Sequence, residues 1–431
     1  MPLVATTLAP GPARFLGWRV VAAAFVVAVF GWGVSFYGPP VFLHALHQQR
    51  GFSLPLVSAA ITAHFLVGAG FVAGLAALHR RFGLPAVTRA AALATALGFL
   101  GWALADQPWQ LFAAAPLTAF GWAGTGGAAI NAMVAPWFIR RRPAALSMAY
   151  NGASIGGVVF SPLWVLLIAW LGYAPAVLAV SLAMVPLLWW LAGRYFAAGP
   201  AALGLAPDGE APPPAPASTP AAPPLPGAAL WRNRRFVTLA AASSLGLFAQ
   251  IGLIAHLFSL LVPALGAPLA GMVAGLATVC AIVGRTAMGW LLPAGADRRR
   301  AAAANYAMQA CGSLVLLAAG GAVVPLLVLG VVLFGLGLGN ATSLPPLMAQ
   351  QDFTPAETAR VVALVTACSQ AAYAFAPAAF GLLRQAEAGA APGLFIAAAG
   401  AQLLAAAMVL AGRPGSGLSR PRAPARRTRS A

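Results

Sequence analysis

The sequence predicts an all-α membrane protein with twelve spanning helices arranged in two six-helix, pseudo-symmetric halves. Of its 431 residues, 61% are apolar and only 7% are charged, whereas a water-soluble domain carries about 25% charged residues. The apolar residues also fall into runs of about 20 residues, the length that a helix needs to cross a bilayer. These observations exclude an ordinary soluble enzyme, a disulfide scaffold and a disordered protein.

The apolar runs place the expected helices along the chain. Six lie near residues 18–42, 55–78, 88–105, 110–135, 144–170 and 173–195, and six more near 236–261, 268–292, 301–320, 324–347, 360–383 and 392–411. We therefore expect an N-terminal half over residues 1–196 and a C-terminal half over 236–411. Between them, residues 197–235 should form a Pro-rich linker, and residues 412–431 a disordered basic tail.

The arginines predict the orientation of the chain. All 25 basic residues are arginines, and 22 of them fall in segments that are cytoplasmic if the N-terminus is inside. Because basic loops stay in the cytoplasm, both termini and the linker are expected there. The net charge of +18 would suggest nucleic acid in a soluble protein; here the arginines separate apolar runs, so the expected partner is the lipid bilayer and not nucleic acid. Lysine-free, Ala- and Arg-rich usage points to a GC-rich genome and so to a multi-pass protein of a bacterial inner membrane.

The two halves contain matching residues. Arg80 recurs as Arg298 and Arg142 recurs as Arg360, each 218 positions later. A shared offset across two pairs of expected helices indicates an ancient duplication, and transporters built this way bind their substrate between the halves.

Three stretches carry a resemblance to a known family. The first expected helix contains GWRVVAAAFVVAVFGWGVSFYGPPVF, and the loop before the fifth begins WFIRRRPAALSMAYNGASIGG. The seventh and eighth contain GLIAHLFSLL and GRTAMGWLL. On these motifs the chain resembles a major facilitator superfamily (MFS) transporter over nearly its whole length, and within it the branch of monocarboxylate transporters and oxalate/formate antiporters. The resemblance implies transport by alternating access.

Several positions depart from that branch. Ala281 lies where animal monocarboxylate carriers have an acid, and Pro40 where they have a lysine. Arg80 replaces the usual acid of the loop between the second and third helices, and the chain lacks the lysine that oxalate exchangers carry in the eleventh helix. The resemblance therefore supplies neither the substrate nor the coupling ion.

Arg285 is the residue expected to bind the substrate. It lies seven residues before Leu292, about 10 Å from the expected cytoplasmic edge. A guanidinium keeps its proton, and leaving it against hydrocarbon would cost about 2.5–3.5 kcal/mol. All seven acids fall in loops, the linker or helix ends, so the expected counter-ion is a small organic anion, a monoanion rather than a dianion. Alternatively, Arg285 reaches the cytoplasmic face or binds backbone carbonyls.

A few other polar residues lie at intramembrane depth and could line a central cavity, because polar groups that face lipid are costly. They are Tyr37, Asn131, Tyr150, Asn151, Gln250, His256, Asn340, Gln370 and Tyr373. All but Gln250 are taken, with Arg285, as the predicted substrate-binding residues, although each could instead bond a neighbouring helix. His256 also matches the His-Leu of the branch.

Coupling is left open by the sequence. His64 and His256 are the candidates for proton coupling, because histidine titrates near neutral pH. Otherwise the substrate carries its own proton, or one anion is exchanged for another.

Basic clusters at equivalent cytoplasmic ends are expected to set topology and to contribute to a cytoplasmic gate. The predicted gate residues are Arg80, Arg140, Arg141, Arg142, Asp297 and Arg298, with Asp297 as an ion-pair partner. No metal or other cofactor is expected, since the three cysteines lie in apolar stretches and no Cys or His pair has ligand spacing.

We therefore expect a monomeric secondary active transporter that moves a small organic anion, a monocarboxylate, with protons or by anion exchange. The alternative is an MFS exporter of drugs or other hydrophobic small molecules, which would share every topological feature. An enzyme would need a clustered nucleophile, base or metal set, and a channel a polar lining ring; the sequence indicates neither.

Overall fold

The computed structural model describes residues 15–209, 227–293, 295–385 and 391–413, and every regular element in these ranges is helical. The middle of the predicted linker, residues 210–226, lies outside the described residues, and so does the predicted tail beyond residue 413. A short helix, α9 (Gly227–Arg232), and three single 3-10 turns, η1 (Ala135–Trp137), η2 (Ala201–Leu203) and η3 (Pro207–Gly209), accompany the long helices.

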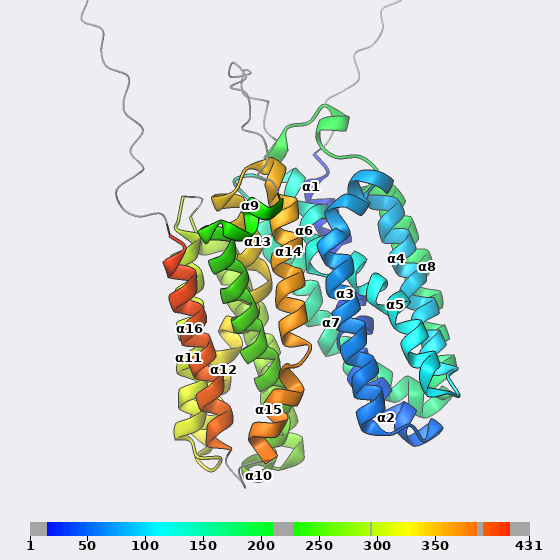
Figure 1. The fold of residues 1–431 in the computed structure, drawn as a ribbon, viewed down its shortest axis with the longest axis vertical. Helices are drawn as coiled ribbons and strands as arrows, with labels where there is room; N and C mark the ends of the chain where they lie inside the picture. Colours follow the sequence, from blue (N-terminus) through cyan, green and yellow to red (C-terminus); the bar gives the residue numbers. More distant parts are fainter. Residues whose placement is uncertain (1–14, 210–226, 294, 386–390, 414–431) are drawn as a thin grey trace, which may run out of the picture.

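Eight helices form an N-terminal bundle (Figure 1), in which α1 packs on α7 and α4 packs on both α5 and α8. Its helices are α1 (Gly17–Ser35), α2 (Gly38–Arg50), α3 (Leu54–Phe82), α4 (Leu84–Ala103), α5 (Pro108–Thr125), α6 (Gly127–Val134), α7 (Arg142–Leu171) and α8 (Tyr173–Tyr195).

Seven helices form a C-terminal bundle beside it (Figure 1), in which α11 packs on α12 and α16 and α10 packs on the same two helices. They are α10 (Arg234–Leu291), α11 (Arg298–Ala318), α12 (Val324–Leu338), α13 (Asn340–Asp352), α14 (Pro355–Tyr373), α15 (Ala376–Gln385) and α16 (Pro392–Ala411). The long α10 consists of two arms, Arg234–Gly266 and Leu269–Leu291. They turn at Gly266, whose φ of 69° is one that glycine adopts without strain.

Eleven segments of the described chain are long and apolar enough to cross a membrane. Each begins and ends within a few residues of one expected run, or extends it. The run expected at 110–135 is not among them. In the structure this run is divided at Gly126, whose extended backbone (ψ −166°) separates α5 from α6. The predicted count of twelve spans is therefore not confirmed by length and apolarity.

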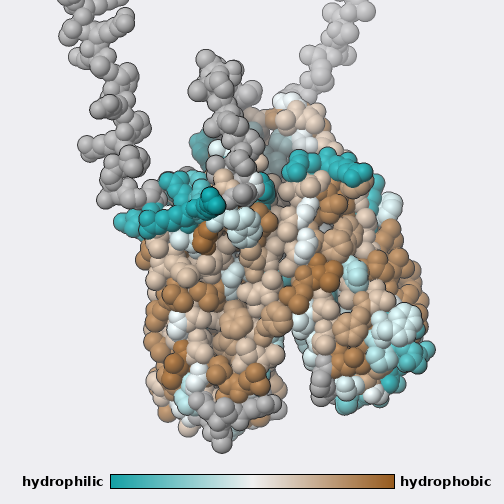
Figure 2. All heavy atoms as spheres, in the orientation of Figure 1, coloured by the Kyte–Doolittle hydropathy of each residue, from teal (hydrophilic) through white to brown (hydrophobic). Residues whose placement is uncertain are grey.

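Polar and apolar surfaces are segregated. One end of both bundles carries Arg80, Arg142 and Arg298, and Figure 2 shows hydrophilic residues gathered along it; we call this end the arginine face. Away from it the bundles expose large apolar side chains such as Trp170, which is 79% exposed. Such a surface is suited to contact with lipid.

The two bundles meet at the arginine face and separate at the opposite end. Trp18 stacks on Trp290 with ring centroids 6.2 Å apart, and Gln350 Nε2 donates to Asn131 Oδ1 at 3.2 Å. At the other end, Figure 2 shows a hollow between the bundles. The structure is thus closed at the arginine face and open opposite it.

Candidate functional site

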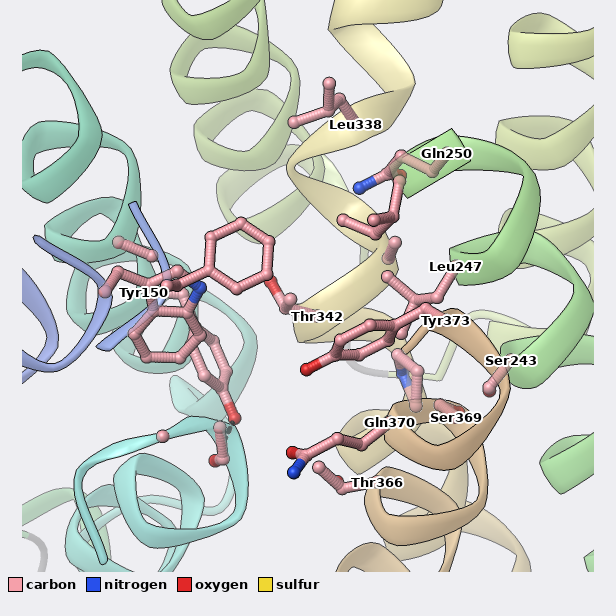
Figure 3. Close-up of a pocket in the computed structure, with 18 of the residues that line it drawn as sticks. Tyr150, Ser243, Leu247, Gln250, Leu338, Thr342, Thr366, Ser369, Gln370 and Tyr373 are labelled. Atoms are coloured by element: carbon pink, nitrogen blue, oxygen red, sulfur yellow. Dashed lines mark hydrogen bonds between the residues drawn. The ribbon is translucent and has the colours of Figure 1, made fainter. Parts of the chain in front are cut away.

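A cavity lies between the two bundles, with an empty volume of about 1050 Å³ including its part open to solvent (Figure 3). The side chains that the N-terminal bundle contributes are mainly aromatic, namely Trp32, Phe36, Tyr37, Trp122 and Tyr150. The C-terminal bundle contributes mainly aliphatic and small polar side chains, among them Leu247, Gln250, Ile251, Ile254, Leu338, Thr342, Val365, Thr366, Ser369 and Gln370. A mostly apolar wall with a few polar groups is typical of a small-molecule site.

Interruptions of the helices expose this cavity wall. Phe36 and Tyr37 lie at the break between α1 and α2, Gly126 at the break between α5 and α6, and Tyr373 where α14 ends before α15. In transporters, broken helices of this kind surround substrate sites, because irregular backbone at membrane depth is tolerated where it lines a cavity.

Arg285, on the second arm of α10, is buried at the cavity and bridges the two bundles. Its Nε donates to Gly339 O at 2.7 Å, within its own bundle. Its Nη1 donates to three oxygens of α7: Tyr150 O at 2.6 Å, Asn151 Oδ1 at 3.1 Å and Ser154 Oγ at 3.4 Å. The residue is 3% exposed and lines the cavity.

The positive charge of Arg285 is met only by neutral oxygens. Within the described chain, no carboxylate pairs with it and its Nη2 has no hydrogen-bond partner. Arg285 therefore binds backbone carbonyls, as expected under the alternative interpretation, and it also lines the cavity. The Nη2 group of the guanidinium remains available to a ligand.

The aromatic wall is held rigidly. Trp32 meets Trp122 edge to face at 4.9 Å, and Phe36 stacks on Trp122 at 5.9 Å. The Tyr150 hydroxyl donates to Gly127 O at 2.7 Å. Because the rings fix one another, their faces toward the cavity are set before a ligand arrives.

Gln370 joins the bundles at the other side of the cavity. Its Oε1 accepts from Trp122 Nε1 at 2.7 Å, and its Nε2 donates to Phe65 O at 2.7 Å. Tyr373, one turn further along α14, packs on Phe65 with ring centroids 5.6 Å apart. Gln370 thus borders the cavity with both ends of its amide occupied.

Three predicted asparagines lie away from the cavity wall. Asn151 donates to Thr286 Oγ1 at 2.8 Å and accepts from Arg285, so it supports the guanidinium from behind. Asn131 lines a separate cavity nearer the arginine face. Asn340 bonds Asn305 Oδ1 inside the C-terminal bundle at 2.9 Å.

Neither predicted proton-coupling histidine lines the cavity. His64 is fully buried in the N-terminal bundle, where Nδ1 lies 2.8 Å from Thr118 Oγ1 and the ring packs on Phe65 and Trp102. His256 Nε2 donates to Pro377 O of α15 at 3.0 Å. Their positions give no support to a role at the central site.

Asp297, predicted as an ion-pair partner of a cytoplasmic gate, has its ion-pair partners within the C-terminal bundle. It caps α11 by accepting from the backbone N–H groups of Arg299 and Arg300, and it pairs with Arg413 at 2.7 Å, all within the C-terminal bundle. Burial opposes its ionisation, but the Arg300 N–H and Arg413 outweigh this and hold the pKa of Asp297 below its ordinary value. The carboxylate is therefore used as a helix cap.

The other predicted gate residues surround the closed face. Arg80 and Arg142 line the cavity that also contains Asn131. Arg140 and Arg141 donate their backbone N–H groups to the Asp208 carboxylate of the linker, at 2.8 and 3.2 Å. Arg298 lies in the first turn of α11, where its backbone N–H donates to Gln351 Oε1 at 3.1 Å.

Several cavity residues were not predicted. They are the aromatic Trp32, Phe36 and Trp122 and the hydroxyl residues Ser154, Thr342, Thr366 and Ser369. Aromatic and small hydroxyl residues also fill ordinary helix contacts, so their type alone carries no signal. The feature of the sequence that comes closest to marking them is a position beside a helix break, as for Phe36, which precedes Gly38-Pro39-Pro40.

Comparison with known proteins agrees with this architecture. The family model described as Major Facilitator Superfamily matches residues 21–377. No curated protein matches the chain. Among solved structures, the crystal structure of a variant of the E. coli fucose:proton symporter FucP is similar with a TM-score of 0.66 at 16% identity, covering 93% of this chain and 100% of that one. At this identity the likeness shows the fold alone. The family match shows a multi-pass membrane transporter rather than an enzyme, and the chain belongs to the Major Facilitator Superfamily.

Proposed function

We propose that this protein is a secondary active transporter that carries a small organic anion, a monocarboxylate, through the cavity between its bundles. The observation that carries the proposal is Arg285: a buried guanidinium at the cavity, without a carboxylate partner in the described chain and with Nη2 unoccupied. A carboxylate is a strong hydrogen-bond acceptor for a charged N–H donor such as Nη2.

The surroundings of Arg285 favour an anion with one charge. The rest of the cavity wall is mostly apolar, and electrostatic attraction is stronger there than in water because the local dielectric constant is low. A single carboxylate neutralises the guanidinium, whereas a second would remain in an apolar site without a cation. This favours a monocarboxylate over a dicarboxylate.

The bridge made by Arg285 links binding to alternating access. Its Nη1 holds three oxygens of α7 while the arginine face is closed. A carboxylate on the guanidinium competes with the weakest of these bonds, the one to Ser154 Oγ at 3.4 Å, and so loosens the contact between α7 and α10. We place the arginine face in the cytoplasm of a bacterium, so that the described state faces outward, and the protein acts as a monomer because one chain encloses the cavity.

Uptake into proteoliposomes tests the proposal. Labelled lactate, pyruvate, formate and larger monocarboxylates are supplied with and without a pH gradient, and with unlabelled anion inside. We expect at least one to accumulate and to be displaced by other carboxylates but not by the corresponding amides. Stimulation by the pH gradient indicates proton symport, the activity named for the fucose transporter; stimulation by internal anion indicates exchange.

Two results contradict the proposal. If no carboxylate moves or raises the melting temperature of the protein, the anion site is wrong. If neutral hydrophobic compounds move and carboxylates do not compete, the exporter alternative holds.

A cross-link tests alternating access separately. Asn131→Cys and Gln350→Cys place two thiols on the bonded pair that joins the bundles at the arginine face, in a chain whose native cysteines are replaced by alanine. We expect a short bifunctional thiol reagent to stop uptake, because the arginine face can no longer open. The control pair, Arg50→Cys with Asp106→Cys, joins two residues of one bundle and should leave uptake intact when linked; undiminished uptake with the first pair linked would exclude opening at this face.

A further inference from the structure

Gln250 is a buried amide that faces the cavity without a hydrogen-bond partner. It lies on the first arm of α10, is 4% exposed and lines the cavity. Its Oε1 is buried and unpaired, and within the described chain its Nε2 has no partner either. Figure 3 shows the amide nitrogen pointing into the cavity.

The other buried glutamines of the described chain differ in this respect. Gln370 uses both ends of its amide, Gln309 donates to Gly337 O at 3.0 Å, and Gln402 accepts from Ser313 Oγ at 2.9 Å. Burying an amide without partners is unfavourable. A ligand that supplies hydrogen-bond partners to the Gln250 amide would therefore remove this unfavourable free energy.

The two cavity walls differ in composition, and this difference indicates the shape and polarity of the rest of the ligand. In Figure 3, Tyr150 lies on one side and Gln250, Leu247 and Tyr373 lie on the other. The first side continues into Trp32, Phe36 and Trp122, whose rings are fixed by one another, while Leu247 and its neighbours Ile251 and Ile254 make the second side aliphatic. A flat apolar body between these sides contacts ring faces on one side and methyl groups on the other.

We propose that the substrate is an aromatic monocarboxylate with a hydrogen-bonding substituent, such as a hydroxyl, on its ring or side chain. The inference rests on the proposed function, since Arg285 binds the carboxylate. The ring lies against the wall of Trp32, Phe36 and Trp122, and the Nε2–H of Gln250 donates to the substituent's oxygen. No group is transferred and no bond is broken.

Matched acids separate the three contacts. Propionate, 3-phenylpropionate and 3-(4-hydroxyphenyl)propionate differ first by a ring and then by one hydroxyl, and each is measured as a competitor of uptake and by the melting temperature of the protein. We expect the ring to improve competition at least about fivefold and the hydroxyl to improve it about tenfold more.

Two variants assign the contacts to residues. Gln250→Met keeps length and removes the amide, so we expect it to reduce the hydroxyl preference to below about threefold. Phe36→Leu keeps an apolar side chain and removes a ring, so the ring preference should fall by about fivefold. The controls are Gln402→Met, buried in the same bundle away from the cavity, and Phe258→Leu, which is 47% exposed on the outer surface; both should keep the wild-type preferences.

The outcomes distinguish this inference from the proposed function. If propionate competes as well as both aromatic acids, the aromatic assignment is wrong while the anion site stands. If the preferences exist but survive Gln250→Met and Phe36→Leu, these residues do not recognise the substrate and the inference falls. If no carboxylate binds, the proposed function falls with it. Retained melting temperatures show that the variants fold.

Discussion

Replacing Arg285 by alanine is expected to reduce carboxylate uptake at least about 100-fold. Among the described residues that line the cavity, Arg285 is the one cation. Truncating one partner of a buried, hydrogen-bonded charge pair costs about 2–5 kcal/mol. Arg285→Lys should also lose most uptake. One ammonium cannot hold Gly339 O, the oxygens of α7 and a carboxylate in the fork geometry that the guanidinium provides. Initial uptake rates in proteoliposomes measure both effects.

One control variant and one further measurement separate binding from the bridging role of Arg285. Arg50→Ala removes an arginine that is 35% exposed and pairs with Asp106, and it should transport normally. Because Arg285 also holds α7, Arg285→Ala should loosen the closed arginine face and slow cross-linking between cysteines at positions 131 and 350. An Arg285→Ala protein that retains half of the wild-type rate, still inhibited by carboxylates, would contradict a substrate role for this residue.

The helices were predictable because membrane insertion depends on local sequence. A run of apolar residues long enough to cross a bilayer forms a helix wherever it lies in the chain, so eleven expected runs have counterparts. The interruption at Gly126 was not predictable in the same way. It depends on one extended backbone conformation, and glycine permits such a conformation without requiring it.

The direction of the candidate side chains was not predictable from the sequence. Asn131 bonds Gln350 nearer the arginine face, and Asn340 bonds Asn305 inside its bundle, so neither faces the central cavity. When a helix is apolar on all sides, hydropathy does not fix its rotation. Arg285 illustrates a second limit, because its partners Gly339 O and Tyr150 O are backbone atoms that every residue possesses and no side chain reveals.

Asp352→Ala is expected to cause the largest loss of stability among single substitutions at the arginine face. Asp352 Oδ2 accepts from Arg299 Nε at 2.7 Å, and only 2% of the Arg299 side chain and 8% of the Asp352 side chain are exposed. Arg299 also donates to Arg235 O and to Val409 O, so it ties α13 to the ends of α10, α11 and α16. Removing the carboxylate leaves a buried charge without its partner, which costs about 3–5 kcal/mol.

The exposed pair of Arg50 and Asp106 is the matched control for this effect. Its side chains are 35% and 69% exposed, and such pairs contribute about 0.2–1 kcal/mol. The melting temperature of purified protein in detergent should therefore fall much further for Asp352→Ala than for Asp106→Ala. Replacing Arg299 and Asp352 together by leucine and methionine should recover part of the loss, because no uncompensated charge then remains buried. Equal decreases for the two alanine variants would show that the position of Arg299 does not depend on the carboxylate, and that the carbonyls of Arg235 and Val409 suffice to hold it.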